Sequence, residues 1–317
     1  MPHMLSSTVA AALLSIAVLR ATPALAQHVF VAARGSDTNP CTFAAPCRTF
    51  QHAHDTVAAN GAIDVLDPAD YGALTITKAI TIEGRGFASI AVAGGATGIT
   101  VNATLTDAVI LSGLLIEGGG VGANGIMFNG AKSLVVENCV VRKMTGSGLF
   151  FARSVRYLQS LSVSNSYFTD SSYGIRIQPQ TTGTVAAAIE RVALSSNAAG
   201  LWVYGIGGTG AINVAVTDSV AANNNVGFAV HSEFGHSVSS LVLTRATAAG
   251  NVIGVRAIAG VGAESRQFAT VRIAQSTVTG NLIGYEALAN GVILSYGDNY
   301  IDVSAANVGT LGSAAKQ

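Results

Sequence analysis

A repeat of 23 to 30 residues constrains this chain more than any other feature. Each repeat has a glycine followed by a short segment in which apolar residues alternate with others. In four successive units an asparagine also stands three residues before the glycine, as Asn-x-x-Gly. Self-similarity at such a period is typical of stacked repeat architectures. The glycines are Gly98, Gly125, Gly148, Gly174, Gly200, Gly227, Gly254 and Gly284.

One repeat is too short to fold alone, and its period-2 alternation predicts strands rather than helices. Each unit must therefore bury its apolar face against neighbouring units, which predicts an all-β fold, a parallel β-solenoid. Stacking in register places like residues above like, so we expect a hydrogen-bonded asparagine ladder at one turn. We expect the glycine that follows to supply a backbone angle that a Cβ forbids. The ladder residues are Asn197, Asn224, Asn251 and Asn281.

The alternation also separates two faces of the strand that follows each glycine. We expect the first and third residues after the glycine to fill the core, as in Ile126 and Phe128. The second and fourth residues are expected to face water. In the later coils the outward residues are Arg176, Gln178, Trp202, Tyr204, Ala229, His231, Arg256, Ile258, Glu286 and Leu288.

The charge pattern limits the classes of partner. Only 11% of the residues are charged, with 17 basic and 17 acidic residues, against about 25% charged in an average globular protein. Uncharged outward positions avoid stacking like charges on neighbouring strands. The basic residues are scattered singly, so no basic stripe suited to phosphates is present and a nucleic-acid partner is not expected.

Residues 1–26 resemble a secretory signal. An apolar run over residues 9–19 is followed by Ala24-Leu25-Ala26 ahead of Gln27, which is the Ala-x-Ala cleavage pattern. The alternative is an uncleaved anchor, which Arg20 at the end of the run disfavours. No later apolar run is long enough to span a bilayer. We expect a secreted or periplasmic protein, cleaved near Ala26 and without a membrane span in the mature chain.

The three cysteines fit an exported protein. Cys41 and Cys47 are close together in a Pro-rich loop, where they can close a small disulfide. Cys139 lies among apolar residues, and we interpret it as a buried, inert thiol rather than a nucleophile.

The chain divides into four parts. After the signal, residues 27–61 hold a first strand, the cysteine loop and a helix that Thr49 caps. Phe50, Ala53 and Val57 lie on one face of this helix, and Gly61 is expected to end it. The helix would cover the open N-terminal end of the solenoid. Residues 62–307 form the coils, and residues 308–317 form a C-terminal tail.

The segment 30–86 resembles the N-terminal part of secreted right-handed parallel β-helix proteins of the pectate-lyase-like superfamily. The resemblance depends on Gly35-Ser36-Asp37 with Asn39-Pro40, on Pro46-x-Arg48-Thr49, on Asp67-Pro68 with Tyr71-Gly72, and on the segments 75–78 and 80–82. It implies that the coils wind in a right-handed sense. The Asn-Thr-Asp motif of β-helix polygalacturonases and the Trp-Ile-Asp-His block of common pectate lyases are absent. No catalytic residue is therefore transferred from the family.

The outward positions supply the candidate site. Trp202, Tyr204 and Gln178 suit sugar binding, because aromatic rings stack on sugars. Arg176 and Arg256 suit the carboxylate of a uronate. His231, near Glu233 and His236, is a candidate base, and Glu286 is a lone candidate acid. The alternative is an ordinary solvated strand face.

A metal site is also considered. Asp64, Asp67 and Asp70 recur at a spacing of three and offer hard oxygen ligands for Ca²⁺, the one cofactor that the sequence suggests. The alternative is a turn built around Asp67-Pro68. His52 and His54 are two apart on a helix, so they do not share a face.

Three functional hypotheses follow. The first is a carbohydrate-binding or surface-associated protein that uses the outward face, with an acidic polysaccharide as partner. The alternative is a polysaccharide lyase, or a hydrolase, that acts on a uronic-acid polymer. The third is a structural solenoid that neither binds nor cleaves sugars.

Overall fold

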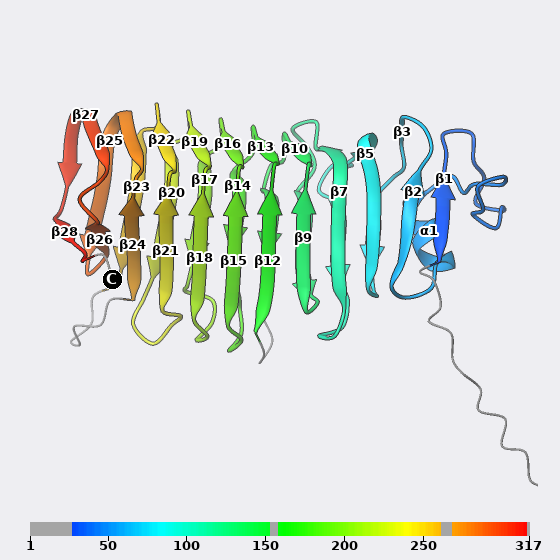
Figure 1. Cartoon of the computed structure of the whole chain (residues 1–317), viewed down its shortest axis with the longest axis horizontal. Helices are drawn as coiled ribbons and strands as arrows, with labels where there is room; N and C mark the ends of the chain where they lie inside the picture. The colour runs from blue at the N-terminus through cyan, green and yellow to red at the C-terminus, as the bar shows by residue number, and fades with distance from the viewer. Residues whose placement is uncertain (1–26, 153–157, 261–267, 316–317) are drawn as a thin grey trace, which may run out of the picture.

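The computed structural model describes residues 27–152, 158–260 and 268–315. The predicted signal lies outside these residues. The described chain winds into a stack of coils along one long axis (Figure 1). Each full coil contributes one strand to each of three parallel sheets, and every strand pairing in the described residues is parallel. The predicted all-β parallel β-solenoid is confirmed.

Sheet 1 contains the first strand of each coil. It consists of β1 (His28–Val31), β2 (Gly61–Val65), the first parts of β5 (Ile80–Ala91) and β7 (Ala108–Glu117), β9 (Ser133–Glu137), β12 (Gln159–Ser164), β15 (Val185–Glu190), β18 (Ile212–Thr217), β21 (Ser239–Thr244), β24 (Ala269–Ala274), β26 (Val292–Ser295) and β28 (Leu311–Ser313).

Sheet 2 contains short strands. It consists of β3 (Ala69–Asp70), the second parts of β5 and β7, β10 (Val140–Arg142), β13 (Tyr167–Thr169), β16 (Ala193–Ser195), β19 (Val220–Ala222), β22 (Thr247–Ala249), and the first parts of β25 (Thr277–Ala289) and β27 (Tyr300–Val308).

Sheet 3 contains the strands that follow the repeated glycines. It consists of β4 (Leu74–Ile76), β6 (Thr97–Asn102), β8 (Asn124–Gly130), β11 (Ser147–Phe151), β14 (Tyr173–Ile177), β17 (Ala199–Tyr204), β20 (Val226–Ser232), β23 (Ile253–Ala259), and the second parts of β25 and β27.

The coil interior is the hydrophobic core. Inward residues of sheet 3 such as Leu201, Val203 and Phe228 are fully buried, as the alternation predicts. Tyr285 and Ala287 differ, because both are only partly buried. They lie near the C-terminal end, where β25 pairs with β27 through several register shifts, so packing there is looser.

The asparagine ladder lies between sheets 2 and 3. The side-chain oxygen of Asn224 accepts hydrogen bonds from the backbone N–H and the Nδ2 of Asn197, at 2.9 and 3.2 Å. Asn251 does the same for Asn224, and Asn281 for Asn251. Each Nδ2 also donates to a backbone carbonyl of the preceding coil. The buried amide groups therefore have hydrogen-bond partners within the core.

The repeated glycines have a different role from the one expected. None of them has a positive φ; that conformation belongs instead to the residue just before each asparagine, such as Ser196 and Asn223. A Cβ added to Gly200 would lie 2.6 Å from the carbonyl oxygen of Gly227, and the corresponding distances for the repeated glycines from Gly98 to Gly254 are 2.6 to 2.8 Å. The glycines are required for the close approach of neighbouring coils.

Helix α1 (Phe50–Thr56) begins at the predicted cap, where the Thr49 hydroxyl accepts from the His52 N–H. The helix ends before Gly61, because Val57 is already extended. Gly61 instead opens β2, where a Cβ would lie 2.4 Å from the Val57 side chain. Helix α1 lies at the N-terminal end of the stack (Figure 1).

The parallel stack extends beyond residues 62–307 in both directions. Strand β1 pairs with β2, so the first segment already contributes a strand to sheet 1. Strand β28 pairs with β26 within the predicted tail. Both additions arise because any segment of strand length that reaches an open end of a stack gains a hydrogen-bonded neighbour there.

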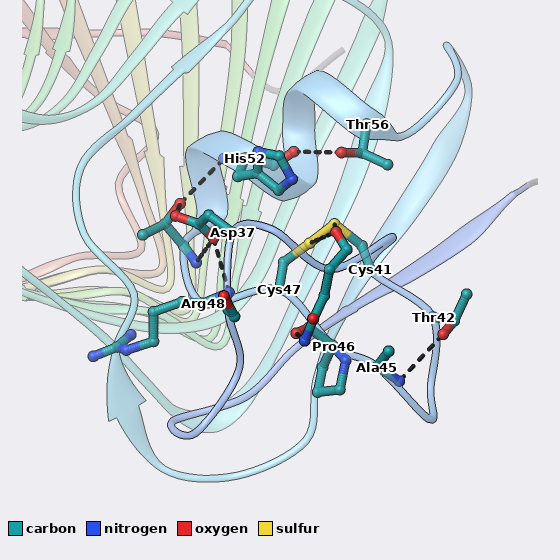
Figure 2. Close-up of a disulfide and its surroundings, with 12 residues drawn as sticks. Asp37, Cys41, Thr42, Ala45, Pro46, Cys47, Arg48, His52 and Thr56 are labelled. Atoms are coloured by element: carbon teal, nitrogen blue, oxygen red, sulfur yellow. Dashed lines mark hydrogen bonds between the residues drawn. A yellow bond between two sulfur atoms is a disulfide. The ribbon is translucent and has the colours of Figure 1, made fainter.

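A disulfide joins Cys41 and Cys47 beside the first strand (Figure 2). His52 is near the two sulfurs, but both sulfurs are engaged in the disulfide. Cys139 is fully buried, and burial raises the pKa of its thiol to about 11. The thiol therefore stays protonated, which agrees with the inert role expected for it.

No helix in the described part of the chain is long and apolar enough to cross a membrane.

Candidate functional site

The outer face of sheet 3 carries the candidate residues. The second and fourth residues after each glycine project outward by alternation. The residue before the glycine joins them, as its contacts with Trp202 and Ala229 show, although strict alternation would turn it inward. We call the surface formed by these residues on β14, β17, β20 and β23 the outer face. Its residues are Tyr173, Arg176, Gln178, Ala199, Trp202, Tyr204, Val226, Ala229, His231, Ile253, Arg256 and Ile258.

This face is less open to water than expected. Ala229 is fully buried although it points outward, and Ala199, Val226 and Ile253 are also buried. The four form a second hydrophobic cluster, on which Trp202 packs. Large side chains on one strand lean over small ones on the next, because neighbouring parallel strands are only about 4.8 Å apart. The face is therefore an apolar, ring-bearing surface.

Arg176 lies among aromatic rings. Its guanidinium carbon is 4.8 Å from the Phe150 ring centroid, 5.0 Å from that of Tyr173 and 5.8 Å from that of Tyr204. It donates a hydrogen bond to the Gln178 side-chain oxygen. It forms no ion pair with any carboxylate in the described residues. The rings hold the cation in place while its charge stays unneutralised.

Trp202 and Tyr204 form a row of rings across the strands. The Trp202 ring meets Tyr173 edge-on, with centroids 6.1 Å apart, and lies 6.4 Å from the Tyr204 centroid. Tyr204 in turn meets His231 edge-on at 5.1 Å. The row joins the sugar-binding candidates to the candidate base.

His231 is a neutral imidazole at pH 7. Burial lowers its pKa below the ordinary value of 6.5, and the positive charge of Arg256 lowers it further. Glu233 acts in the opposite direction, with a carboxylate oxygen 3.6 Å from Nε2 of His231. Near pH 7 the ring therefore has a nitrogen able to accept a proton.

Arg256 and Glu286 pair with each other. Arg256 donates to the Glu286 carboxylate across adjacent strands, and their side chains are only 21% and 11% exposed. Glu286 was expected to stand alone and to face water, but it is buried at the end of this pair. Because each neutralises the other, neither is a free cation or a free acid.

A polar hollow continues the surface toward the N-terminus. It has a volume of about 400 Å³ and is lined by Asn102, Asn129, Ala152, Gln180 and Thr181. Asn129 donates from Nδ2 to Oδ1 of Asn102 at 3.0 Å. Asn102, Asn129 and Ala152 occupy the fourth position after the glycine, as Gln178 and Tyr204 do. The hollow therefore adjoins the outer face.

The three aspartates proposed for calcium do not converge. Asp64 accepts from His28 at 2.7 Å and from Arg85 at 3.3 Å. Asp67 accepts from the Ala33 N–H and the Tyr71 hydroxyl, and Asp70 accepts from two backbone amides. In the described residues these carboxylates do not form a cluster within ligand distance. Each secures a separate part of the first coils, because Asp-Pro turns the chain between them.

Acid is expected to destabilise these first coils. The Tyr71 hydroxyl and the Ala33 amide hold the pKa of Asp67 below 3.8, against the effect of burial. For Asp37 burial also raises the pKa, but hydrogen bonds from Thr49 and Arg48 lower it by more (Figure 2). The stabilisation is full above pH 3.8 and is lost as pH falls through the lowered values.

The variant Asp67→Asn tests this dependence. The drop in unfolding free energy between pH 7 and pH 3 should be smaller in the variant than in the wild type, as measured by denaturant titration. An unchanged drop would mean that Asp67 does not contribute to acid sensitivity.

The sequence did not predict the aromatic rings that surround Arg176. Tyr173 precedes the glycine, and strict period-2 alternation carried back across the glycine would place it on the inward side with Ile175. Its contacts with Trp202 and Arg176 show instead that it lies on the outer face. The burial of Ala229 has no sequence signal either, since it depends on the side chains of neighbouring coils.

Comparison with known proteins supports the fold. No family model matches the sequence, and no curated protein sequence matches it. Among solved structures, pectate lyase Pel9A superposes with a TM-score of 0.61 at 16% identity, over 92% of this chain and 79% of that chain. The alginate lyase from Paenibacillus sp. str. FPU-7 gives a TM-score of 0.44 at 13% identity, over 86% and 99% of the two chains. The chain therefore shares the fold of this pectate lyase, a right-handed parallel β-helix.

Proposed function

We propose that the outer face binds an acidic polysaccharide. The observation that carries the proposal is Arg176, a cation held by aromatic rings without a carboxylate partner in the described residues. Such a guanidinium suits the carboxylate of a uronate, because its planar donors match carboxylate geometry. Trp202 lies beside it and offers an apolar ring on which a sugar can stack.

A polymer would run along the stack axis. From the strand of Asn129 to that of His231 the surface crosses five adjacent strands, a span of about 19 Å at about 4.8 Å per step. Amides in the hollow near Asn129 would bind hydroxyl groups. Arg176 would bind a carboxylate farther along. Several sugar units would contact the protein at once.

We propose that the protein acts after export. Residues 1–26 have the pattern of a signal cleaved near Ala26. The Cys41–Cys47 disulfide suits an oxidising compartment, where polysaccharides of cell surfaces are found.

We further propose that α1 shields the first coil. Phe50 and Ala53 are fully buried, and the helix contacts β1, β2 and β4. A covered end prevents pairing of exposed strand edges with another chain.

Two substitutions test binding. Arg176→Ala should weaken binding of an acidic oligosaccharide by about 10-fold or more, because a charge-assisted hydrogen bond contributes about 1.5 to 3 kcal/mol. Trp202→Ala should weaken it by about 10-fold through lost stacking. Isothermal titration calorimetry at low and high salt measures both, and salt should weaken the wild type more than Arg176→Ala.

Matched controls lie away from the outer face. Arg245 pairs with Asp218 at the corner between sheets 1 and 2, and Tyr167 is exposed on sheet 2. Arg245→Ala and Tyr167→Ala should bind as the wild type does. Equal affinity in all four variants would contradict the proposal, and absence of binding in the wild type would favour a structural solenoid.

A second candidate function is a polysaccharide lyase. The observation that favours it is His231, a neutral base next to Tyr204 on the face that carries Arg176. β-Elimination from a uronate requires a base and a group that neutralises the carboxylate. Ultraviolet absorbance of the unsaturated product, followed over a panel of acidic polysaccharides, tests this candidate.

A further inference from the structure

Tyr204 and His231 stand side by side on adjacent strands. They are register partners in sheet 3, and their rings meet edge-on with centroids 5.1 Å apart. Both occupy the fourth position after the glycine, so both project from the same side of the sheet. One is a phenol that can donate a proton, and the other is an imidazole that can accept one.

The surroundings of His231 favour the role of base, which leaves the phenol of Tyr204 as the proton donor of the pair. His231 is neutral near pH 7 because burial and Arg256 lower its pKa. The carboxylate of Glu233, 3.6 Å from Nε2, would stabilise the imidazolium that forms on proton uptake. His231 is thus the base and Tyr204 the acid.

The carboxylate of the substrate has a matching partner. The guanidinium carbon of Arg176 is 5.8 Å from the Tyr204 ring centroid. Strand β17, which carries Tyr204, lies between β14 with Arg176 and β20 with His231. Gln178 accepts a hydrogen bond from Arg176 and fixes its direction. A uronate with its carboxylate on Arg176 would lie over Tyr204 within reach of His231.

We propose that Tyr204 and His231 are the acid–base pair of a β-elimination whose substrate is a 4-linked uronate with its C5 hydrogen and C4 oxygen on the same face of the ring. This inference rests on the lyase candidate above. His231 takes the proton from C5, and the electron pair forms the C4–C5 double bond as the C4–O bond breaks. Tyr204 gives its proton to the departing oxygen, while Arg176 stabilises the charge on the carboxylate.

The stereochemical restriction follows because both side chains project from the same side of sheet 3. A sugar lying on the outer face meets both residues from one side, so the proton must leave from the side on which the leaving oxygen receives one. Mannuronate and glucuronate place the two groups on the same face of the ring. Galacturonate and guluronate place them on opposite faces, which would require a second group above the sugar.

The experiment compares four polymers of defined composition: 4-linked mannuronan, guluronan, galacturonan and a glucuronate-containing glycan. Unsaturated product is followed by ultraviolet absorbance, and binding of each polymer is measured on the same preparation. The inference expects product from mannuronan or the glucuronate glycan and at least 10-fold less from the other two. Activity should persist in the presence of a chelator, because Arg176 supplies the positive charge.

Variants then test the two roles. Tyr204→Phe removes only the hydroxyl, and His231→Gln removes the base; each should lower kcat by about 100-fold or more with a smaller effect on KM. Tyr167→Phe and His52→Gln, which lie away from the outer face, should retain full activity.

Each failure has its own pattern. Product mainly from galacturonan or guluronan would overturn the stereochemical inference while the lyase candidate stands. Full activity in Tyr204→Phe or His231→Gln would overturn the assigned roles. Binding without product from any polymer would overturn the inference and the lyase candidate but leave the binding proposal intact. Absence of both would overturn all three.

Discussion

Asn224→Ala is expected to lower the free energy of unfolding by about 3–5 kcal/mol. The substitution removes four hydrogen bonds of the buried Asn224 side chain. Its Oδ1 accepts from the N–H and Nδ2 of Asn197, and its Nδ2 donates to the Leu194 carbonyl and to Oδ1 of Asn251. Each bond contributes about 1 kcal/mol net, and buried groups left without a partner add a further penalty. Chemical denaturation followed by fluorescence measures the change.

The neighbouring residue is the matched control. Asn225 is exposed, and its backbone bonds to Asn197 and Ile253 do not depend on its side chain. Asn225→Ala should change stability by less than about 0.5 kcal/mol. If the two variants were equally stable, the ladder would not stabilise the stack.

Gly200→Ala is expected to destabilise the protein by about 3 kcal/mol. The new Cβ would lie 2.6 Å from the carbonyl oxygen of Gly227, which is backbone and part of the next coil. Relief requires two coils to move apart, at the cost of sheet hydrogen bonds and core packing. The denaturation midpoint of the variant should fall well below that of the wild type.

Gly94→Ala is the control for this substitution. Its Cβ would meet only Val121, at 3.9 Å, and Gly94 has no positive φ. The control should leave stability within about 1 kcal/mol of the wild type. Tolerance of alanine at Gly200 would show that the coils do not approach as closely at this turn as the structure indicates.

The architecture was predictable because the repeat is local and regular. Alternation fixes which side of a strand is apolar, and the recurring asparagine marks the turn where coils stack. The helix cap at Thr49 and the Cys41–Cys47 disulfide could also be predicted, because residues close in sequence determine both.

Most of the details that failed depend on contacts between coils. The role of Gly200 is set by a carbonyl oxygen 27 positions later in the chain. Glu286 became a buried ion-pair partner through Arg256 on the previous coil. Asp64, Asp67 and Asp70 were close in sequence, yet each binds groups from a different segment. Spacing along one strand carries no information on these neighbours.

The most direct measurement uses the single tryptophan of the chain, Trp202, which lies on the outer face. Its fluorescence reports on that face alone. Titration with an acidic oligosaccharide should give a saturable change in emission, at the concentration at which calorimetry detects binding. The change should require about 10-fold more ligand in Arg176→Ala. Calorimetric binding with unchanged Trp202 emission would place the ligand elsewhere and contradict the central claim.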